Sequence, residues 1–150
     1  MNVGYLASNA AKEYLAAAGL TTVSNFYAEM ENPFSADETQ NNKRELPCVV
    51  CFFGAGQEYP LGTGNYSGEL SIRIEANAST QTAAQLEAIF NEVWSKISTD
   101  TILDDLSSAG TDFTAFGFTG GIQQTAQVIE GRLRTKAMVL PINCCPSDVS

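Results

Sequence analysis

The hydrophobic positions of the chain recur at two spacings, one typical of helices and one typical of strands. Apolar and small residues recur at helical spacing from Gly4 to Ala18, and Gly19 follows where a left-handed C-terminal cap is favoured. A second helix is predicted to end near Ile97, with Ser79 or Thr80 as its N-cap. Its apolar stripe, in which Trp94 is expected to anchor the core, consists of Ala83, Leu86, Ile89, Phe90, Val93, Trp94 and Ile97.

Four longer segments are predicted as β-strands. Cys48 to Phe53 is apolar on both faces, which is typical of a central strand. Gly68 to Ala76 alternates apolar and polar side chains, which is typical of a half-exposed strand. Residues 112–119 and 126–142 form the last two segments, and Gly131 indicates a bulge within the final one.

The order of these elements predicts an α+β domain: an antiparallel or mixed β-sheet of about four to five strands, with two main helices packed on one face. Leu20 to Met30 is ambiguous and favours a short additional strand. The length of 150 residues predicts a single domain over residues 1–150. We expect a polar loop at about residues 31–46, a long loop from Gly54 to Gly64, and a flexible carboxy tail at about residues 143–150.

Charge and composition exclude several classes of function. Eight basic and 17 acidic side chains give a net charge of −9, which excludes the basic footprint of an ordinary DNA- or RNA-binding domain. The chain has no histidine, so histidine-dependent catalytic triads, histidine-ligated metals and histidine pH switches are excluded. No apolar run approaches the roughly 20 residues of a membrane-spanning helix, and no signal peptide is evident. We therefore expect a soluble protein made inside the cell, without membrane contact.

Four cysteines are the strongest candidates for metal or redox chemistry. Cys48 and Cys51 form a C-x-x-C pair, and Cys144 and Cys145 are adjacent, so a four-thiolate zinc site is possible by count. However, the spacer Val49-Val50 is strand-like, and residues three apart on a strand point to opposite faces. The pattern favours buried, reduced thiols, with a small metal-binding or redox domain as the alternative.

Other candidate chemistry is weaker. No phosphate-binding glycine motif is present, and paired acids such as Asp104 and Asp105 lie in polar stretches typical of solvated surface. We predict no enzymatic activity and no cofactor, and a hydrolase that uses paired acids is the weakest alternative. Arg132, Arg134 and Lys136 are predicted to lie on one face of the last strand, either facing an acidic partner or forming the solvent side of the sheet.

Five segments follow one another in a distinctive order: an Ala-rich first helix, Leu46–Val50, Gly68–Ile74, a helix through Leu86–Phe90, and a closing strand at Ile129–Leu140. From about Tyr5 to Ile142, this order and its hydrophobic pattern resemble the tail terminator proteins of long-tailed bacteriophages, also called tail completion or head-tail joining proteins. The resemblance lies in element order and pattern, because the family has no sharp residue motif.

The resemblance implies a structural virion protein. It implies a homo-oligomer, a hexameric ring that caps the tail tube protein and presents its other face to the head-tail connector or stopper protein. It implies a place in the virion tail or neck after assembly in the bacterial host cytoplasm, and no catalytic residues. Genomic DNA would pass through the lumen without specific binding, which the net charge of −9 suits. A neck stopper or a minor tail subunit is the alternative within this class.

Two loop segments, one polar and one partly apolar, are the expected docking surfaces of such a ring. They are Glu31 to Glu45 and Gly54 to Gly64, because loops with a few apolar side chains often carry interfaces. The residues predicted at the assembly interface are Phe34, Glu58, Tyr59, Leu61, Arg132 and Arg134.

Overall fold

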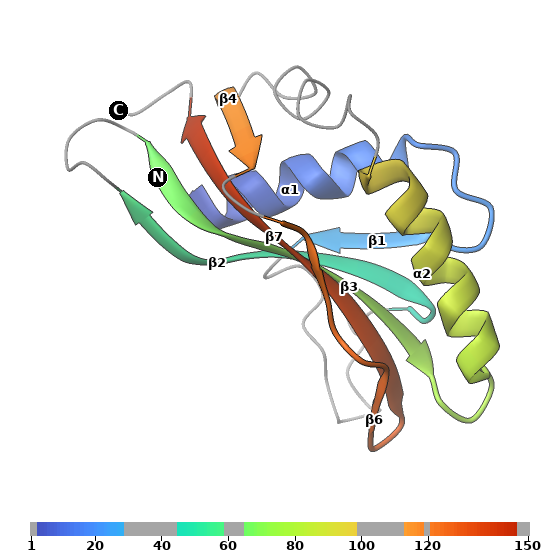
Figure 1. Cartoon of the computed structure of the whole chain (residues 1–150). Helices are drawn as coiled ribbons and strands as arrows, with labels where there is room; N and C mark the ends of the chain where they lie inside the picture. The colour runs from blue at the N-terminus through green and yellow to red at the C-terminus, as the bar shows by residue number, and fades with distance from the viewer. Residues whose placement is uncertain (1–2, 29–44, 59–64, 99–112, 119–120, 147–150) are drawn as a thin grey trace.

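The structure is a computed structural model, and it describes residues 3–28, 45–58, 65–98, 113–118 and 121–146. The described residues form two helices and seven strands (Figure 1). In chain order the elements are α1 (Val3–Ala16), β1 (Asn25–Ala28), β2 (Cys48–Glu58), β3 (Tyr66–Asn77), α2 (Ala83–Ile97), β4 (Phe113–Phe118), β5 (Gln123–Gln124), β6 (Val128–Glu130) and β7 (Leu133–Pro146).

The strands form one mixed sheet, which confirms the predicted α+β class. The strand order is β1-β2-β3-β7-β4, and the short strands β5 and β6 also pair with β7. β1 is parallel to β2, and all other pairs are antiparallel. The last strand in sequence, β7, therefore lies in the interior of the sheet, between β3 and β4 (Figure 1).

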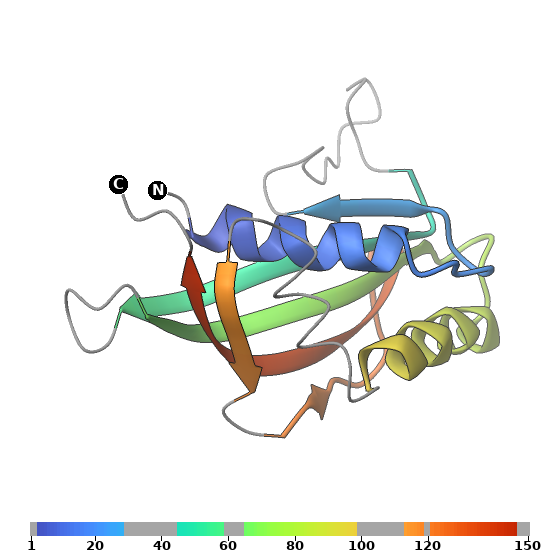
Figure 2. The ribbon, with the colours of Figure 1, turned by 90° about the horizontal axis from the view of Figure 1, so that it is seen from above.

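Both helices pack on one face of the sheet, as expected (Figure 2). Leu70 pairs with Leu140 and Ile74 with Val49, so alternate residues of β2, β3 and β7 point to this face. α1 approaches β2 closely because its buried stripe is rich in alanine, and α2 contributes larger side chains. The helix residues buried in this core are Ala7, Ala10, Ala11, Leu15, Leu86, Ile89, Phe90, Val93 and Ile97.

The ends of the helices follow from local capping. Gly19 adopts a φ of 75°, the left-handed conformation that its position predicted. The predicted N-cap of α2 at Ser79 or Thr80 is wrong, because Thr82 and Gln85 form a capping box there. The Gln85 backbone N–H donates to Thr82 Oγ1 at 3.2 Å, and the Thr82 N–H donates to Gln85 Oε1 at 2.7 Å.

The final predicted strand is in fact a hairpin. Glu130 pairs with Leu133, and Gly131 and Arg132 form the turn between β6 and β7. Gly131 has a φ of 61°, which glycine adopts readily and which a two-residue hairpin turn requires. The bulge predicted at Gly131 is therefore wrong, because the chain reverses direction at this residue.

β2 is longer than predicted, so the expected loop from Gly54 begins too early. Pairing with β3 continues to Glu58, opposite Tyr66, with an irregular register between Gly54 and Gln57. Gly68 permits this close approach, since an added Cβ there would lie 2.7 Å from Phe53 Cζ and 2.9 Å from the Gly54 carbonyl oxygen.

The predicted flexible tail is also partly wrong, because β7 continues to Pro146. Asn143 pairs with Ser67 of β3 and with Gly117 of β4, so backbone pairing on both sides holds this segment. Pro141 lacks an N–H but is tolerated in the strand. On the edge of β7 away from β3, the partner strand changes from β4 to β5 at Pro141. None of the described strands therefore needs an N–H from this residue. Of the polar loop, residues 31–44 lie outside the described residues.

Candidate functional site

The hairpin of β6 and β7 carries the most exposed apolar surface of the described chain. Its β7 residues, from Leu133 onward, pair with the end of β3, and β6 lies at the outer edge of the sheet (Figure 1). Val128 and Ile129 are 43% and 54% exposed, and no other large hydrophobic side chain within the described ranges is exposed to this degree. β6 pairs only with β7, so its second edge has no strand partner among the described residues.

The two apolar side chains of β6 lie on opposite faces of the hairpin. Val128 pairs with Thr135, which lies on the sheet face away from the helices. Ile129 pairs with Arg134, which lies on the helix face because Arg134 itself pairs with the buried Ala76. Paired residues on neighbouring strands point to the same side, so the exposed apolar surface continues around the free edge of β6.

Side-chain hydrogen bonds fix the base of the hairpin to the body. Arg134 Nη1 donates to Gln127 Oε1 at 2.9 Å, and Gln127 Nε2 donates to the carbonyl oxygen of Ala83 in the first turn of α2 at 3.2 Å. The Ala137 backbone N–H donates to Thr125 Oγ1, also at 2.9 Å. These bonds hold β6 in a defined orientation relative to α2.

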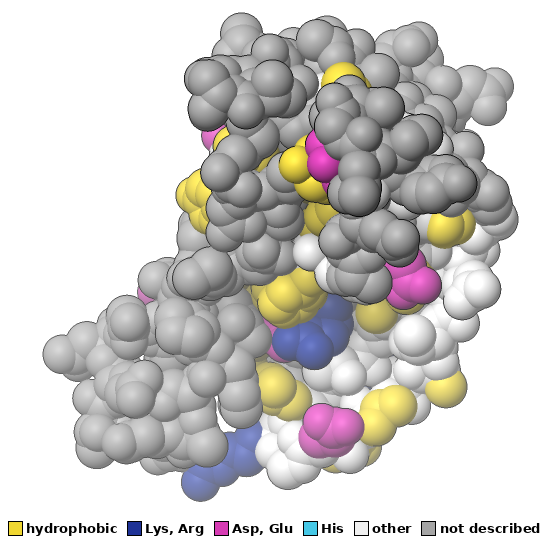
Figure 3. All heavy atoms as spheres, turned by 90° about the vertical axis from the view of Figure 1, so that its left-hand side faces the viewer, with side chains coloured by type: hydrophobic (Ala, Val, Ile, Leu, Met, Phe, Trp, Pro, Cys, Tyr) yellow, Lys and Arg dark blue, Asp and Glu magenta, His cyan; other side chains and the backbone are white. Residues whose placement is uncertain are grey.

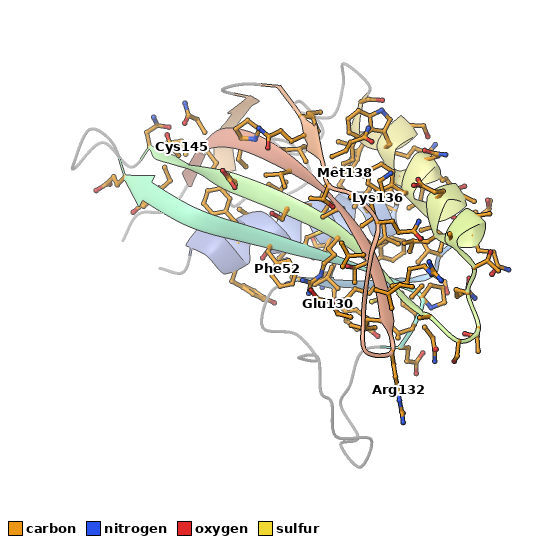
Figure 4. All side chains as sticks on the ribbon, turned by 60° about the horizontal axis from the view of Figure 1, so that its bottom comes forward. Phe52, Glu130, Arg132, Lys136, Met138 and Cys145 are labelled. Atoms are coloured by element: carbon orange, nitrogen blue, oxygen red, sulfur yellow. The ribbon has the colours of Figure 1, made fainter. Side chains whose placement is uncertain are left out.

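The predicted basic face of the last strand is only partly correct, since Arg134 and Lys136 share a face of β7 but Arg132 does not. Arg132 lies in the hairpin turn and points away from the body, whereas Lys136 lies between β7 and α2 (Figure 4). Lys136 Nζ donates to both carboxylate oxygens of Glu87, at 2.8 and 3.0 Å, and lies 4.4 Å from the centre of the Phe90 ring. The register of β7 turns Arg134 and Lys136 toward the helix layer, so neither forms a solvent face.

The opposite face of the sheet holds a charged cluster around one buried carboxylate. Glu75 is only 1% exposed, and its Oε2 lies 2.8 Å from Arg73 Nη2. The Cys48 thiol donates to Glu75 Oε1 at 3.6 Å, and the Arg73 guanidinium lies 5.0 Å from the centre of the Phe52 ring. This arrangement compensates the buried carboxylate and places a guanidinium over an aromatic ring. It explains how a charged residue fits in a buried position.

The cysteines do not converge on one site. Cys48 lies on the face away from the helices and Cys51 in the core, as strand geometry predicted. Burial, with a smaller contribution from Cys145, raises the pKa of the Cys144 thiol to about 12, so this thiol stays protonated. All four cysteines are free, and within the described part of the chain no three His, Cys, Asp or Glu side chains are grouped to hold a metal ion.

The predicted interface residues fall in different places. Phe34, Tyr59 and Leu61 lie outside the described residues. Glu58 is the last residue of β2 and is half-buried, while the two arginines belong to the hairpin. Sequence reasoning missed Val128 and Ile129. The signal was the sequence Val-Ile-Glu-Gly-Arg-Leu, in which a glycine separates two alternating segments.

Comparison with known proteins does not assign this chain to a family. No protein-family model matches the chain, and a search of curated proteins finds no match. Neither described helix is long and apolar enough to cross a membrane. The proposals below therefore depend on the geometry of the hairpin and the sheet, together with the order of elements along the sequence.

Proposed function

We propose that this chain is a structural subunit of a long-tailed phage, a tail terminator that forms a ring, caps the tail tube and joins it to the head connector. Two kinds of support lead to this proposal. The first is the order and pattern of elements, which resemble that family. The second, which carries the proposal, is the exposed edge strand β6 with Val128 and Ile129 on its two faces.

An exposed edge of this kind favours association. Natural proteins protect free edges, since unpaired backbone groups and apolar side chains together promote pairing with another chain. Fully burying a Val or Ile side chain contributes about 1.5–3 kcal/mol, so burying the exposed half of each contributes about 1 kcal/mol. In a ring this gain recurs at every interface, so the exposed surface is explained by a function in assembly.

The distribution of charge along the chain suits a ring through which DNA passes. The described residues carry eight Glu and six Lys or Arg, whereas residues 99–112 contain four Asp and no basic residue. Much of the net negative charge therefore lies in segments such as residues 99–112 and not in the sheet. Figure 3 shows hydrophobic, acidic and basic side chains interspersed on one side of the molecule, without a continuous basic patch among the described residues. Such a surface lacks the counterion-release affinity that would retain DNA.

The test combines solution mass with imaging. We expect the purified protein, alone or on tail tubes of the cognate tube protein, to form a ring of six copies that caps one tube end. Electron microscopy of tubes grown with and without the protein measures capping and tube length. A protein that stays monomeric and leaves tube growth unchanged contradicts the proposal. Binding to the portal adaptor instead of the tube would assign a neck stopper, and stoichiometric bound zinc would favour the cysteine-based alternative.

A further inference from the structure

The free edge of β6 offers backbone groups as well as side chains. Glu130 and Leu133 close the two-residue turn, and the closing pair of such a hairpin exchanges hydrogen bonds within the ladder. The next pair, Ile129 with Arg134, is then a non-hydrogen-bonded pair, so the N–H and C=O of Ile129 point away from β7. Ile129, the most exposed large hydrophobic residue of the described chain, thus also presents backbone groups that pair with no described strand.

The positions of Val128 and Ile129 determine the shape of a suitable partner. A flat surface placed against one face of the hairpin covers one of these side chains and leaves the other in water. A strand added to the edge covers both, since its own side chains alternate between the two faces. The partner is therefore a β-strand that extends the sheet.

The other end of the same sheet supplies a matching strand. β1 pairs with β2 on one side, and none of the described strands pairs with its other side. Phe26 pairs with Val49 and lies on the helix face, whereas Tyr27 pairs with Val50 and lies on the opposite face. β1 therefore offers one half-buried aromatic side chain on each face, where β6 offers one β-branched side chain on each face.

Strand direction and charge agree with this match. β1 runs parallel to β2, and through β3 and β7 the alternation leaves β6 antiparallel to β1. Copies related by rotation about a ring axis would therefore bring β6 beside the next β1 in antiparallel orientation, with both helix layers on the same side. Residues 21–28 and 123–129 carry no Lys, Arg, Asp or Glu, and Glu130 and Arg132 balance each other. Two copies of this acidic chain can meet there without strong like-charge repulsion.

We infer that β6 of one copy pairs antiparallel with β1 of a second copy, with Ile129 opposite Phe26 and Val128 opposite Tyr27, so that one continuous sheet runs around the ring. The inference rests on the proposed function, because only a head-to-tail ring uses both edges of every copy. The inference goes beyond the proposed function by identifying the two strands that meet, β6 of one copy and β1 of the next.

A proline variant tests the pairing directly. Ile129→Pro removes an N–H that points away from β7, so the hairpin keeps its ladder, which far-UV circular dichroism and the melting temperature verify. We expect roughly 100-fold weaker association, measured by sedimentation velocity, from the lost backbone pairing. The matched variant Ile129→Thr keeps the N–H and the strand propensity, and we expect only roughly tenfold weaker association. Equal loss in both variants would show apolar packing without strand pairing and would overturn the inference.

Crosslinking identifies the partner edge. In a Cys145→Ser background, which leaves only buried native thiols, Tyr27→Cys and Val128→Cys are combined. Oxidation of the double variant is expected to give a ladder of covalent oligomers, and neither single variant should give one. A dimer from Val128→Cys alone would show two-fold pairing of β6 with β6 and would overturn the inference.

The outcomes separate this inference from the proposed function. If Ile129→Pro still forms rings that cap tubes, the edge pairing is wrong and the terminator proposal stands. If wild-type rings form through the crosslinked edges but never bind tubes, the edge pairing stands and the terminator proposal fails. A wild-type protein that is monomeric both in solution and on tubes overturns both.

Discussion

Thr22 and Glu92 lie 70 residues apart in sequence and are joined by two short hydrogen bonds. The Thr22 N–H donates to Glu92 Oε1 at 2.9 Å and the Thr22 hydroxyl at 2.6 Å, while Thr21 donates through both its N–H and its hydroxyl. These bonds connect the segment after α1 to α2, beside the hydrogen bond that the Tyr14 hydroxyl of α1 donates to the Lys96 carbonyl oxygen at 3.2 Å. They also hold the pKa of Glu92 at about 2, chiefly through the Thr22 hydroxyl and the two backbone N–H groups.

This contact predicts a defined dependence of stability on pH. The pKa of Glu92 is lowered from 4.5 to about 2 in the folded state, so its stabilising effect is complete above about pH 4.5 and disappears as pH falls toward 2. Because the carboxylate is solvent-accessible, we expect Glu92→Gln to cost only about 1 kcal/mol at pH 7. Thermal unfolding of both proteins between pH 7 and pH 3 measures the difference, which should narrow in acid. Glu13→Gln, at an exposed carboxylate with one weak partner, is the control. A difference that stays constant with pH would contradict the assignment.

The ion pair between Lys136 and Glu87 predicts measurable coupling between α2 and β7. Lys136 is mostly buried and also lies over Phe90, whereas Glu87 is more exposed. We expect Lys136→Ala to cost about 1–2 kcal/mol and the coupling energy with Glu87→Gln to be about 0.5–1 kcal/mol. Urea denaturation of the wild type, the two single variants and the double variant gives the double-mutant cycle from which the coupling energy is calculated. Strictly additive effects would show that the two groups do not interact in solution.

Gly68 predicts a steric limit where β2 and β3 approach each other. A Cβ at this position meets Phe53 Cζ and the Gly54 carbonyl oxygen at under 3 Å, so the strands would have to separate. We expect Gly68→Ala to lower the free energy of unfolding by about 2–3 kcal/mol. Gly54→Ala, where the added Cβ meets nothing within 4 Å, is the matched control and should change it by less than about 1 kcal/mol. Similar values for both variants in denaturant titrations would contradict the described approach of the strands.

The two faces of β7 predict different costs of truncation. Leu140 is fully buried beneath the helices, and Val139, on the opposite face, is half-buried. We expect Leu140→Ala to cost about 2–5 kcal/mol and Val139→Ala about 1 kcal/mol or less. Chemical denaturation measures both. A larger loss at Val139 would mean that the register of β7 is shifted by one residue.

The local sequence pattern predicted some elements correctly and others incorrectly. The stripe of α2 and the alternation in β3 are properties of consecutive residues, so both elements were predicted with correct type and nearly correct ends. Gly131 could serve a bulge or a turn, and only the pairing of Glu130 with Leu133 decides between them. Because that pairing depends on the tertiary structure, the sequence pattern predicted one long strand where the structure has a hairpin.

The same limit applies to the candidate site. Which face Lys136 occupies depends on the register of β7 against β3, and its charge is tolerated because α2 supplies Glu87. Val128 and Ile129 look like core residues in an alternating segment, and they are exposed because neither described helix covers them. Exposure of an apolar residue is a property of the assembled fold, so the local pattern could indicate the hairpin turn but not the exposure of its edge.

The central place of β7 has a consequence for synthesis on the ribosome. Until residues 133–146 have emerged, β3 lacks a neighbour on one side, and β4, β5 and β6 lack their only partner. The nascent chain therefore exposes several incomplete edges at once, and its sheet is completed only when β7 is inserted between β3 and β4. The hairpin edge itself exists only after β7 has been inserted, so the surface that we propose for assembly forms only when the interior of the sheet is complete.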